Sequence, residues 1–359
     1  MSAYFHSYLC GRKAAEWLIN MANNTAQGKT LEKKGFKLPI SGNALVLLIA
    51  LVLVTAIFSA LNPNYFTYGN FINILVSSTL IGLTAIGMTF LIMTGGSDLS
   101  AGSVAAFGGV FIAWGLKNTS MNWVVLALIV LAASSVAGII NGLMVTRLNI
   151  VPFIATLVSQ SLWRGCAYLL CDGRPIAISD AGLKSLGNGM VFGSVPYPVI
   201  MTILLFAVFA FVLSSTKFGR SIFAIGGNAE AARLAGINSN RIKIICYVMT
   251  SVFAAMAGII LASRMFSGQP AASPNLHFDA ITACNLAGVS MVGGVGSIPS
   301  VALGVILVQA FNSGLNMAGV SQYWQYVARA ALLFGSLAID FYRQRNRQKK
   351  LLADSMKNL

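Results

Sequence analysis

The chain has 359 residues, of which 57% are hydrophobic and only 9% are charged. Soluble domains carry roughly 25% charged residues, so this composition excludes a soluble globular protein and indicates an integral membrane protein. The formal net charge of +15 does not predict nucleic-acid binding. The basic residues gather near both ends and in one central loop, which is the pattern of cytoplasmic segments under the positive-inside rule.

The residue types also argue against an enzyme or a metalloprotein. The five cysteines have no CxxC spacing, and the two histidines, His6 and His277, are far apart, so neither a disulfide framework nor a metal site is predicted. The sequence lacks the GxxxxGK[ST] order of a phosphate-binding P-loop, paired acids and a Ser-His-Asp set. We therefore expect no catalytic residues, no metal and no cofactor in this chain.

Ten apolar segments are candidates to cross a bilayer, whose core of about 30 Å needs about 20 helical residues. They cover 44–61, 71–94, a short Gly- and Ala-rich segment that ends near Leu116, 123–145, 151–170, 197–215, 244–263, 278–292, 298–318 and 323–341. The segment 278–292 is polar enough that it needs protein or water around it, which predicts an inner helix or a broken re-entrant segment. The predicted fold class is all-α: a polytopic membrane protein with about ten transmembrane helices, including short or broken inner helices.

Charge orients these segments. An even number of spans places both basic termini in the cytoplasm, and the same alternation places the basic loop 217–243 there too. The expected organisation is a basic cytoplasmic segment 1–43, a transmembrane domain 44–341 and a basic cytoplasmic tail 342–359. Within the first segment, 4–21 is either an interfacial helix on the membrane surface or a loosely ordered tail.

Polar residues within the apolar segments are candidates for a solute pathway, because charged groups at membrane depth usually face a cavity or a partner. Gln160 and Arg164 stand four apart on one helical face, although Arg164 is near enough to the helix end to reach the interface instead. The complete set of candidates is Gln160, Arg164, Asp279, Asn285, Gln309, Asn312 and Asn316.

The turn 95–103 reads GGSDLSAGS. Its glycines favour close backbone approach and a sharp re-entry into the membrane. Asp98 is a candidate N-cap for the helix that begins over 100–103, and a transport role is the alternative.

The loop 217–243 has five basic residues against Glu230 alone. Asn228 can cap a short helix over 229–234, where Ala, Glu and Arg favour the helical state, and Gly236 can end it. An ordinary basic loop would carry similar charge, and what distinguishes this one is its sequence motif, GGNAEAARLAGI, over 226–237.

That motif resembles the coupling loop of bacterial ABC importer permeases, in the ribose, galactose and xylose branch. Three more motifs resemble the same family in the same order: GMTFLIMTGGSDLSAGSV at 87–104, NGLMVTRLNIVPFIATL at 141–157, and FDAI followed by GGVGS within 278–297. YWQYVARAALLF resembles the family's final span. The resemblance implies ATPase coupling by Gly226, Gly227, Asn228, Glu230, Ala231, Ala232 and Gly236.

The resemblance also implies a function and partners. The chain would be the permease subunit of a monosaccharide importer in the bacterial inner membrane, within the lipid bilayer, and a separate ATPase chain would bind ATP and Mg. Glu230 would pair with a basic group on that ATPase. A periplasmic sugar-binding protein would deliver the cargo, and a second permease, identical or a paralogue, would complete the pathway.

The cargo and the energy source have alternatives. Where related permeases have an unbroken small-apolar segment with a Gly-Gly pair, this chain has Ala283, Cys284, Asn285 and then Ala287-Gly288, so the particular sugar stays open. A nucleoside or a sugar-like signalling molecule is the second hypothesis for the cargo. A secondary transporter independent of ATP would need mid-membrane carboxylates, of which Asp279 is the one plausible example, or an inverted repeat.

Overall fold

A computed structural model of the chain describes residues 42–191 and 193–357. The predictions for 1–41, including the segment 4–21, lie outside the described residues. The elements in chain order are α2 (Gly42–Leu61), the 3-10 helix η1 (Pro63–Phe66), α3 (Tyr68–Met93), α4 (Ala101–Asn118), α5 (Trp123–Thr146), α6 (Pro152–Leu170), β1 (Ile176–Ala177), α7 (Ala181–Asn188), β2 (Met190–Val191), β3 (Val195–Pro196), α8 (Tyr197–Ser215), α9 (Lys217–Gly227), α10 (Ala229–Leu234), α11 (Ser239–Arg264), β4 (Ser267–Gly268), α12 (Leu276–Leu286), α13 (Ile298–Met317) and α14 (Gln322–Lys357).

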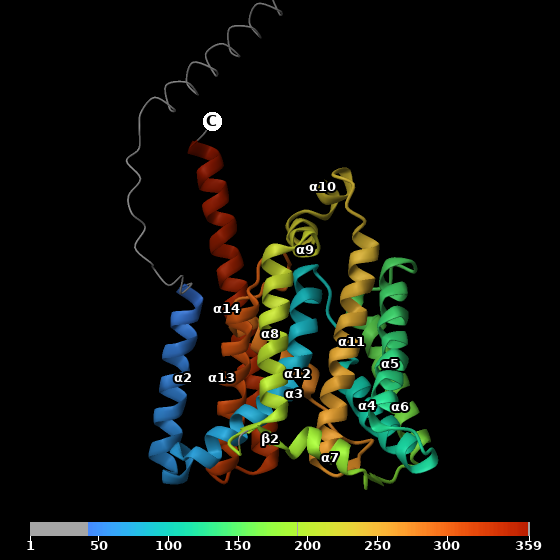
Figure 1. The fold of residues 1–359 in the computed structure, drawn as a ribbon. Coiled ribbons are helices and arrows are strands. Elements are labelled where there is room, and N and C mark those ends of the chain that lie inside the picture. The colour runs from blue at the N-terminus through green and yellow to red at the C-terminus, as the bar shows by residue number, and fades with distance from the viewer. Residues whose placement is uncertain (1–41, 192, 358–359) are drawn as a thin grey trace, which may run out of the picture. The chain divides into compact units, whose positions relative to one another are not determined.

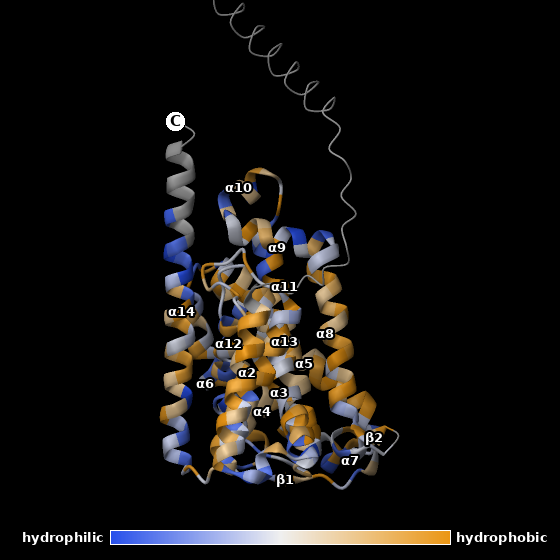
Figure 2. Ribbon diagram, turned by 90° about the vertical axis from the view of Figure 1, so that its left-hand side faces the viewer, coloured by the Kyte–Doolittle hydropathy of each residue, from blue (hydrophilic) through white to orange (hydrophobic). Residues whose placement is uncertain are grey.

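A helix lies in every apolar segment that the sequence predicts to cross the membrane. Six of them, α2, α3, α5, α8, α11 and α13, are long and apolar enough to do so by length and composition. The outer surfaces of α2 and α8 are hydrophobic over most of their length, as expected of helices that face lipid (Figure 2). The chain is therefore a multi-pass helical membrane protein, and the number of ten spans stays a prediction.

Helix α11 lies between α3, α4 and α5. Small residues allow this close approach, because a Cβ on Gly258 would overlap the backbone of Ala105 on α4 and one on Gly138 of α5 would overlap the backbone of Val248. Small residues at helix contacts are the usual basis of packing in membranes, where apolar burial alone provides little drive. The close contacts bury most of α4 and most of the C-terminal two thirds of α11, from Cys246 to Ser263.

Two short antiparallel ladders of two residues each accompany the helices, and the fold remains mostly helical as predicted. β1 pairs with β4, and β2 pairs with β3, with α7 between β1 and β2 in the chain. α7 and β2 lie at the end of the bundle opposite α10 (Figure 1). Strands of two residues have too few positions to show an alternating pattern, so they could not be predicted from the sequence.

The predicted inner segment 278–292 is indeed broken, but its bounds differ. Its helix, α12, covers Leu276–Leu286 and follows a stretch, 265–275, that is mostly non-helical. Gly288 ends α12 in the left-handed region, at φ 86°, and its N–H donates to the carbonyl of Asn285. Glycine is favoured in this conformation after a helix, which explains why Val289 and Val292 do not continue it despite their hydrophobicity.

Candidate functional site

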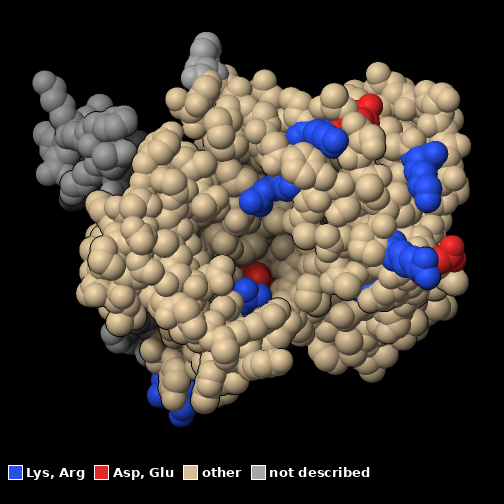
Figure 3. Space-filling model, turned by 90° about the horizontal axis from the view of Figure 1, so that it is seen from below, with Lys and Arg blue, Asp and Glu red and all other residues tan. Residues whose placement is uncertain are grey.

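A cavity of about 910 Å³ lies between α3, α12, α13 and α14. Seen from the end of the bundle that carries α7 and β2, the molecule is hollowed there, with an acidic and a basic group inside the hollow (Figure 3). Leu80 and Ile81 line its inner end, about 20 Å along α3 from Tyr68 at a rise of 1.5 Å per residue. The rest of α3, from Ile81 to Met93, is buried, so protein fills the space beyond the cavity.

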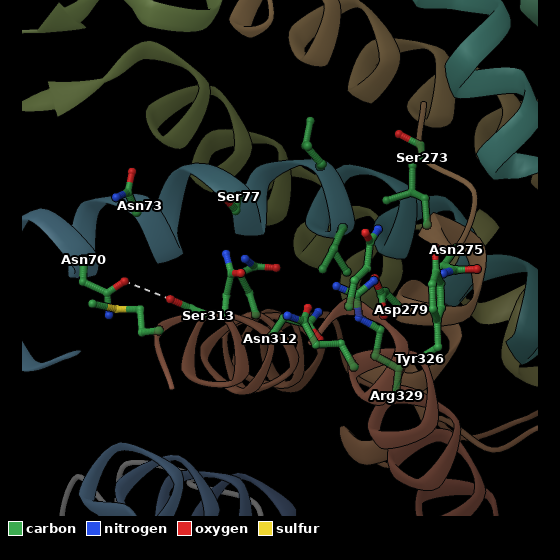
Figure 4. Close-up of a pocket in the computed structure, with 18 of the residues that line it drawn as sticks. Asn70, Asn73, Ser77, Ser273, Asn275, Asp279, Asn312, Ser313, Tyr326 and Arg329 are labelled. Carbon is green, nitrogen blue, oxygen red and sulfur yellow. Dashed lines mark hydrogen bonds between the residues drawn. The ribbon is translucent and has the colours of Figure 1, made fainter. Parts of the chain in front are cut away.

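Helical spacing produces the polar wall. Asn70, Asn73 and Ser77 lie on one face of α3, and the lining residues of α13 and α14 repeat the same spacing of three and four (Figure 4). On α13 these residues are Gln309, Asn312, Ser313 and Asn316, and on α14 they are Gln322, Gln325, Tyr326 and Arg329. The hydroxyl of Ser313 donates to Asn70 Oδ1 at 2.8 Å and joins α13 to α3 across the cavity.

Asp279 and Arg329 are the charged residues of the cavity wall (Figure 4). Within the described residues the one ion pair closer than 4.0 Å is elsewhere, between Glu230 and Arg233, so these two charges are farther apart than that. The buried Nε of Arg329 has no hydrogen-bond partner within the protein. The wall therefore carries one acidic and one basic side chain that form no ion pair closer than 4.0 Å with each other.

The structure brings together four of the seven candidates for the pathway. Asp279, Gln309, Asn312 and Asn316 line the cavity. The other three, Gln160, Arg164 and Asn285, are absent from its wall.

Those three residues have other surroundings. Gln160 is half-buried on α6, and the side chain of Asn285 is fully buried and has no hydrogen-bond partner in the structure. Arg164 Nη1 donates to the carbonyls of Pro270 at 2.6 Å and Ala272 at 2.8 Å, which anchors the stretch before α12. Ser273, Pro274 and Asn275 then line the cavity, so Arg164 acts on its wall through this stretch.

Sequence reasoning missed several residues of the wall. Among them are Asn73, Ser77, Asn275, Gln325 and Arg329, whose side chains carry hydrogen-bonding groups. The spacing that singled out Gln309, Asn312 and Asn316 recurs on α3 and α14, so the same test applied to every helix finds most of them. The positions 283–285, where the sequence differs from related permeases, are not part of the cavity wall. Ala283, Cys284 and Asn285 are all fully buried.

Asp98 does not cap α4 in the predicted manner. Ser100 is the N-cap residue, and Asp98 accepts hydrogen bonds from the backbone N–H and the hydroxyl of Ser100. Asn141 of α5 donates to the same Ser100 hydroxyl oxygen at 3.0 Å. The carboxylate thus fixes the turn before α4 and joins it to α5, away from the cavity.

At the opposite end of the bundle, the loop 217–243 forms two helices and the beginning of α11 (Figure 1). The predicted short helix is confirmed as α10, whose first turn is capped by Asn228 Oδ1, which accepts from the N–H groups of Glu230 and Ala231 at 3.0 Å. Gly236 follows at φ 81°. α9 was not predicted, although Thr216 caps it by accepting from the N–H of Gly219.

The surface of α10 is exposed and carries paired charge. Glu230 and Arg233 form an ion pair at 2.6 Å, and each side chain is 67% exposed. The guanidinium holds the pKa of the Glu230 carboxyl below its ordinary value. Leu234 is 76% exposed at the end of the same helix. Glu230 thus has a partner within its own helix, and its predicted pairing with an ATPase would require an exchange of partners.

A multi-pass bundle with a polar cavity at one end and an exposed capped helix at the other has the features of a transport protein of the membrane. The chain belongs to the permease family described as the branched-chain amino acid transport system permease component, which it matches over residues 70–337. No solved structure matches the chain.

The alignments with curated relatives span most of this chain and most of each relative. The ribose import permease protein RbsC of Haemophilus influenzae is 37% identical over 298 residues, 82% of this chain and 92% of that protein. RbsC of Escherichia coli K12 is 38% identical over 83% of this chain and 93% of its own. The L-arabinose transport system permease protein AraH of Escherichia coli K12 is 37% identical over 84% and 90%. These relatives confirm the resemblance to sugar permeases, and none of the three is named as an enzyme.

Proposed function

We propose that the chain is the transmembrane permease subunit of an ATP-driven ABC importer for a monosaccharide, in the bacterial inner membrane. The observation that carries the proposal is the cavity of about 910 Å³, walled by amide and hydroxyl side chains, at the end of the bundle opposite α10 (Figure 3). The relatives named for ribose and L-arabinose support the cargo, and a relative from Azospirillum brasilense is named as an ABC transporter permease.

The chemistry of the wall suits a neutral polyol. Each sugar hydroxyl donates and accepts hydrogen bonds, and so do the amides of Asn73, Gln309 and Asn312. Asp279 adds an acceptor and Arg329 adds a donor, with opposite charges that offset each other. A solute leaving water therefore finds replacements for its hydrogen bonds without binding to one strong charge, which favours passage over retention.

The proposed partners follow from the two ends of the bundle. A periplasmic sugar-binding protein delivers cargo at the mouth of the cavity, and a second permease, identical or a paralogue, completes the pathway. A separate ATPase chain binds ATP and Mg and receives α10, with the basic termini on its side of the membrane. Closure of the ATPase then favours one arrangement of the permease over another, as a population shift.

The test is sugar uptake and ATP hydrolysis by the permease in proteoliposomes with its co-encoded ATPase. Binding proteins loaded with ribose, L-arabinose, other pentoses, hexoses or nucleosides are added in turn. Stimulation of both activities by a sugar-loaded protein is the expected result, and stimulation by a nucleoside alone would change the cargo class. Uptake without association of an ATPase would establish a secondary transporter and overturn the proposal.

The cavity has its own test. We expect Gln309→Leu to lower uptake several-fold, because it removes a donor and an acceptor from the wall while keeping a similar volume. Gln160→Leu is the matched control, since Gln160 lies on α6 outside the cavity wall. Both variants should still assemble with the ATPase. Equal uptake by the two variants would show that solute does not pass along this wall.

A further inference from the structure

Gly226 and Gly227 are adjacent at the end of α9, directly before α10, but their surroundings differ. A Cβ on Gly227 would have no atom within 4 Å. A Cβ on Gly226 would overlap the carbonyl oxygen of Met93, at the end of α3, and the backbone nitrogen of Gly294. The pair therefore has one glycine in open space and one in contact with the rest of the bundle.

The segment that Gly226 contacts is 287–297, the loop between α12 and α13. The N–H of Gly294 donates to the carbonyl of Met93 at 3.0 Å. Gly293 and Gly294 have φ values of 101° and 72°, which glycine adopts without strain. A Cβ on Gly294 would lie 2.9 Å from the carbonyl carbon of Gly226, so the contact is backbone against backbone on both sides.

The other side of this loop is held by α14. Asp340 Oδ2 accepts hydrogen bonds from the N–H of Met291 at 3.2 Å and from Gln344 Nε2 at 2.8 Å. Gln344 Nε2 also lies 3.3 Å from the hydroxyl of Ser290. Asp340 is 6% exposed. The loop is thus fixed between α9 and α14, the helix whose outer part supplies Arg329 to the cavity wall.

Helix α12 connects this loop to the cavity. It has 11 residues, a length of about 16 Å, and Asp279 lies in its first turn while the loop follows its last. Most of its side chains are buried, and Cys284 contacts Thr89 of α3 at 3.4 Å. A helix held in this way moves as a unit, so a displacement of the loop moves Asp279.

We infer that the contact of Gly226 with Gly293 and Gly294 transmits the movement of α10 to α12 and the cavity, which makes these glycines positioning residues for transport. The inference rests on the proposed function. It divides the GGN sequence between two tasks: Asn228 shapes the helix presented to the ATPase, and Gly226 carries its displacement inward. It also gives a role to GGVGS at 293–297, a motif that the cavity does not use.

The test uses the full complex in proteoliposomes and measures uptake and ATP hydrolysis together. Gly226→Ala should lower the sugar taken up per ATP by about fivefold or more, the lower range of measured allosteric coupling. The rate of ATP hydrolysis by the Gly226→Ala complex, and the affinity of this variant for the ATPase, should change less than the uptake per ATP. Gly335→Ala, at a glycine of α14 outside the cavity wall and with no atom within 4 Å of its Cβ position, should match the wild type.

A second pair separates coupling from folding. Gly294→Ala and Gly319→Ala place alanine at nearly the same φ, 72° and 71°, but Gly319 has no atom within 4 Å of its Cβ position. Only Gly294→Ala should lower uptake per ATP, when equal amounts of monodisperse protein are compared. Normal ratios in both Gly226→Ala and Gly294→Ala would overturn the inference. A wild type without ATP-driven uptake would instead overturn the proposed function.

Discussion

The N-cap of α10 offers a direct test of whether this helix is the surface that docks on the ATPase. Asn228 Oδ1 accepts two backbone N–H groups at the start of a helix of six residues. Replacing an N-cap Asn by Ala costs about 1 kcal/mol, which changes the equilibrium between formed and unformed helix about fivefold. A helix so short has little stability of its own, so this change directly reduces the formed fraction.

If docking requires the formed helix, the apparent Kd for the ATPase rises by up to that same factor. The assay is titration of the ATPase onto the permease in nanodiscs, for the wild type and Asn228→Ala. Asn228→Asp keeps the acceptor oxygen and should bind as the wild type does.

Asn238→Ala is the matched control, because Asn238 caps α11 by accepting from the N–H of Arg241. α11 has 26 residues and is packed in the bundle, so the loss of its cap leaves the helix formed. Equal affinities of Asn228→Ala and Asn238→Ala would refute the reasoning that links the cap to docking.

Three other predictions concern stability and pH. Arg164→Ala should lower the free energy of unfolding by about 2 kcal/mol, because two carbonyls lose a charged donor; an unchanged thermal midpoint in detergent would contradict this. Gly258→Ala should cost about 1–3 kcal/mol by overpacking against α4, whereas Gly165→Ala, with open space at its Cβ, should not destabilise; thermal unfolding of both compares them. Arg233 lowers the pKa of the Glu230 carboxyl, so their ion pair should be fully formed above the ordinary carboxyl pKa of about 4.3 and should be lost as pH falls through the lowered pKa. NMR titration of labelled Glu230 measures this pKa. A midpoint at or above the ordinary value would contradict the pairing.

The helices were predictable because the relevant signals are local. Hydropathy alone predicted the apolar segments. Asn228, followed by Ala and Glu, predicted a helix over 229–234, and α10 has these same bounds. The end of α12 was not predicted, because Val289 and Val292 extend the apolar pattern beyond the point where Gly288 turns the backbone. Local conformation prevailed over composition at that position.

The cavity was only partly predictable, because its wall depends on which helices are neighbours. Gln309, Asn312 and Asn316 could be assigned to one face from spacing, but the sequence does not show that this face meets Asn73 of α3. The partners of Arg164 could not be predicted for the same reason. A charge within an apolar segment indicates a polar partner, and only the fold shows that the partner is a pair of backbone carbonyls.

The non-helical stretch 265–275 has a consequence for how the chain is made. Its backbone groups are satisfied by parts synthesised earlier: Ile176–Ala177 pairs with Ser267–Gly268, and Arg164 binds two of its carbonyls. In lipid such groups need partners, so this stretch cannot leave the insertion machinery for the bilayer on its own. We expect a fragment that begins after Arg264 to integrate stably only when the preceding part of the chain is already in the membrane, which gives the molecule a required order of assembly.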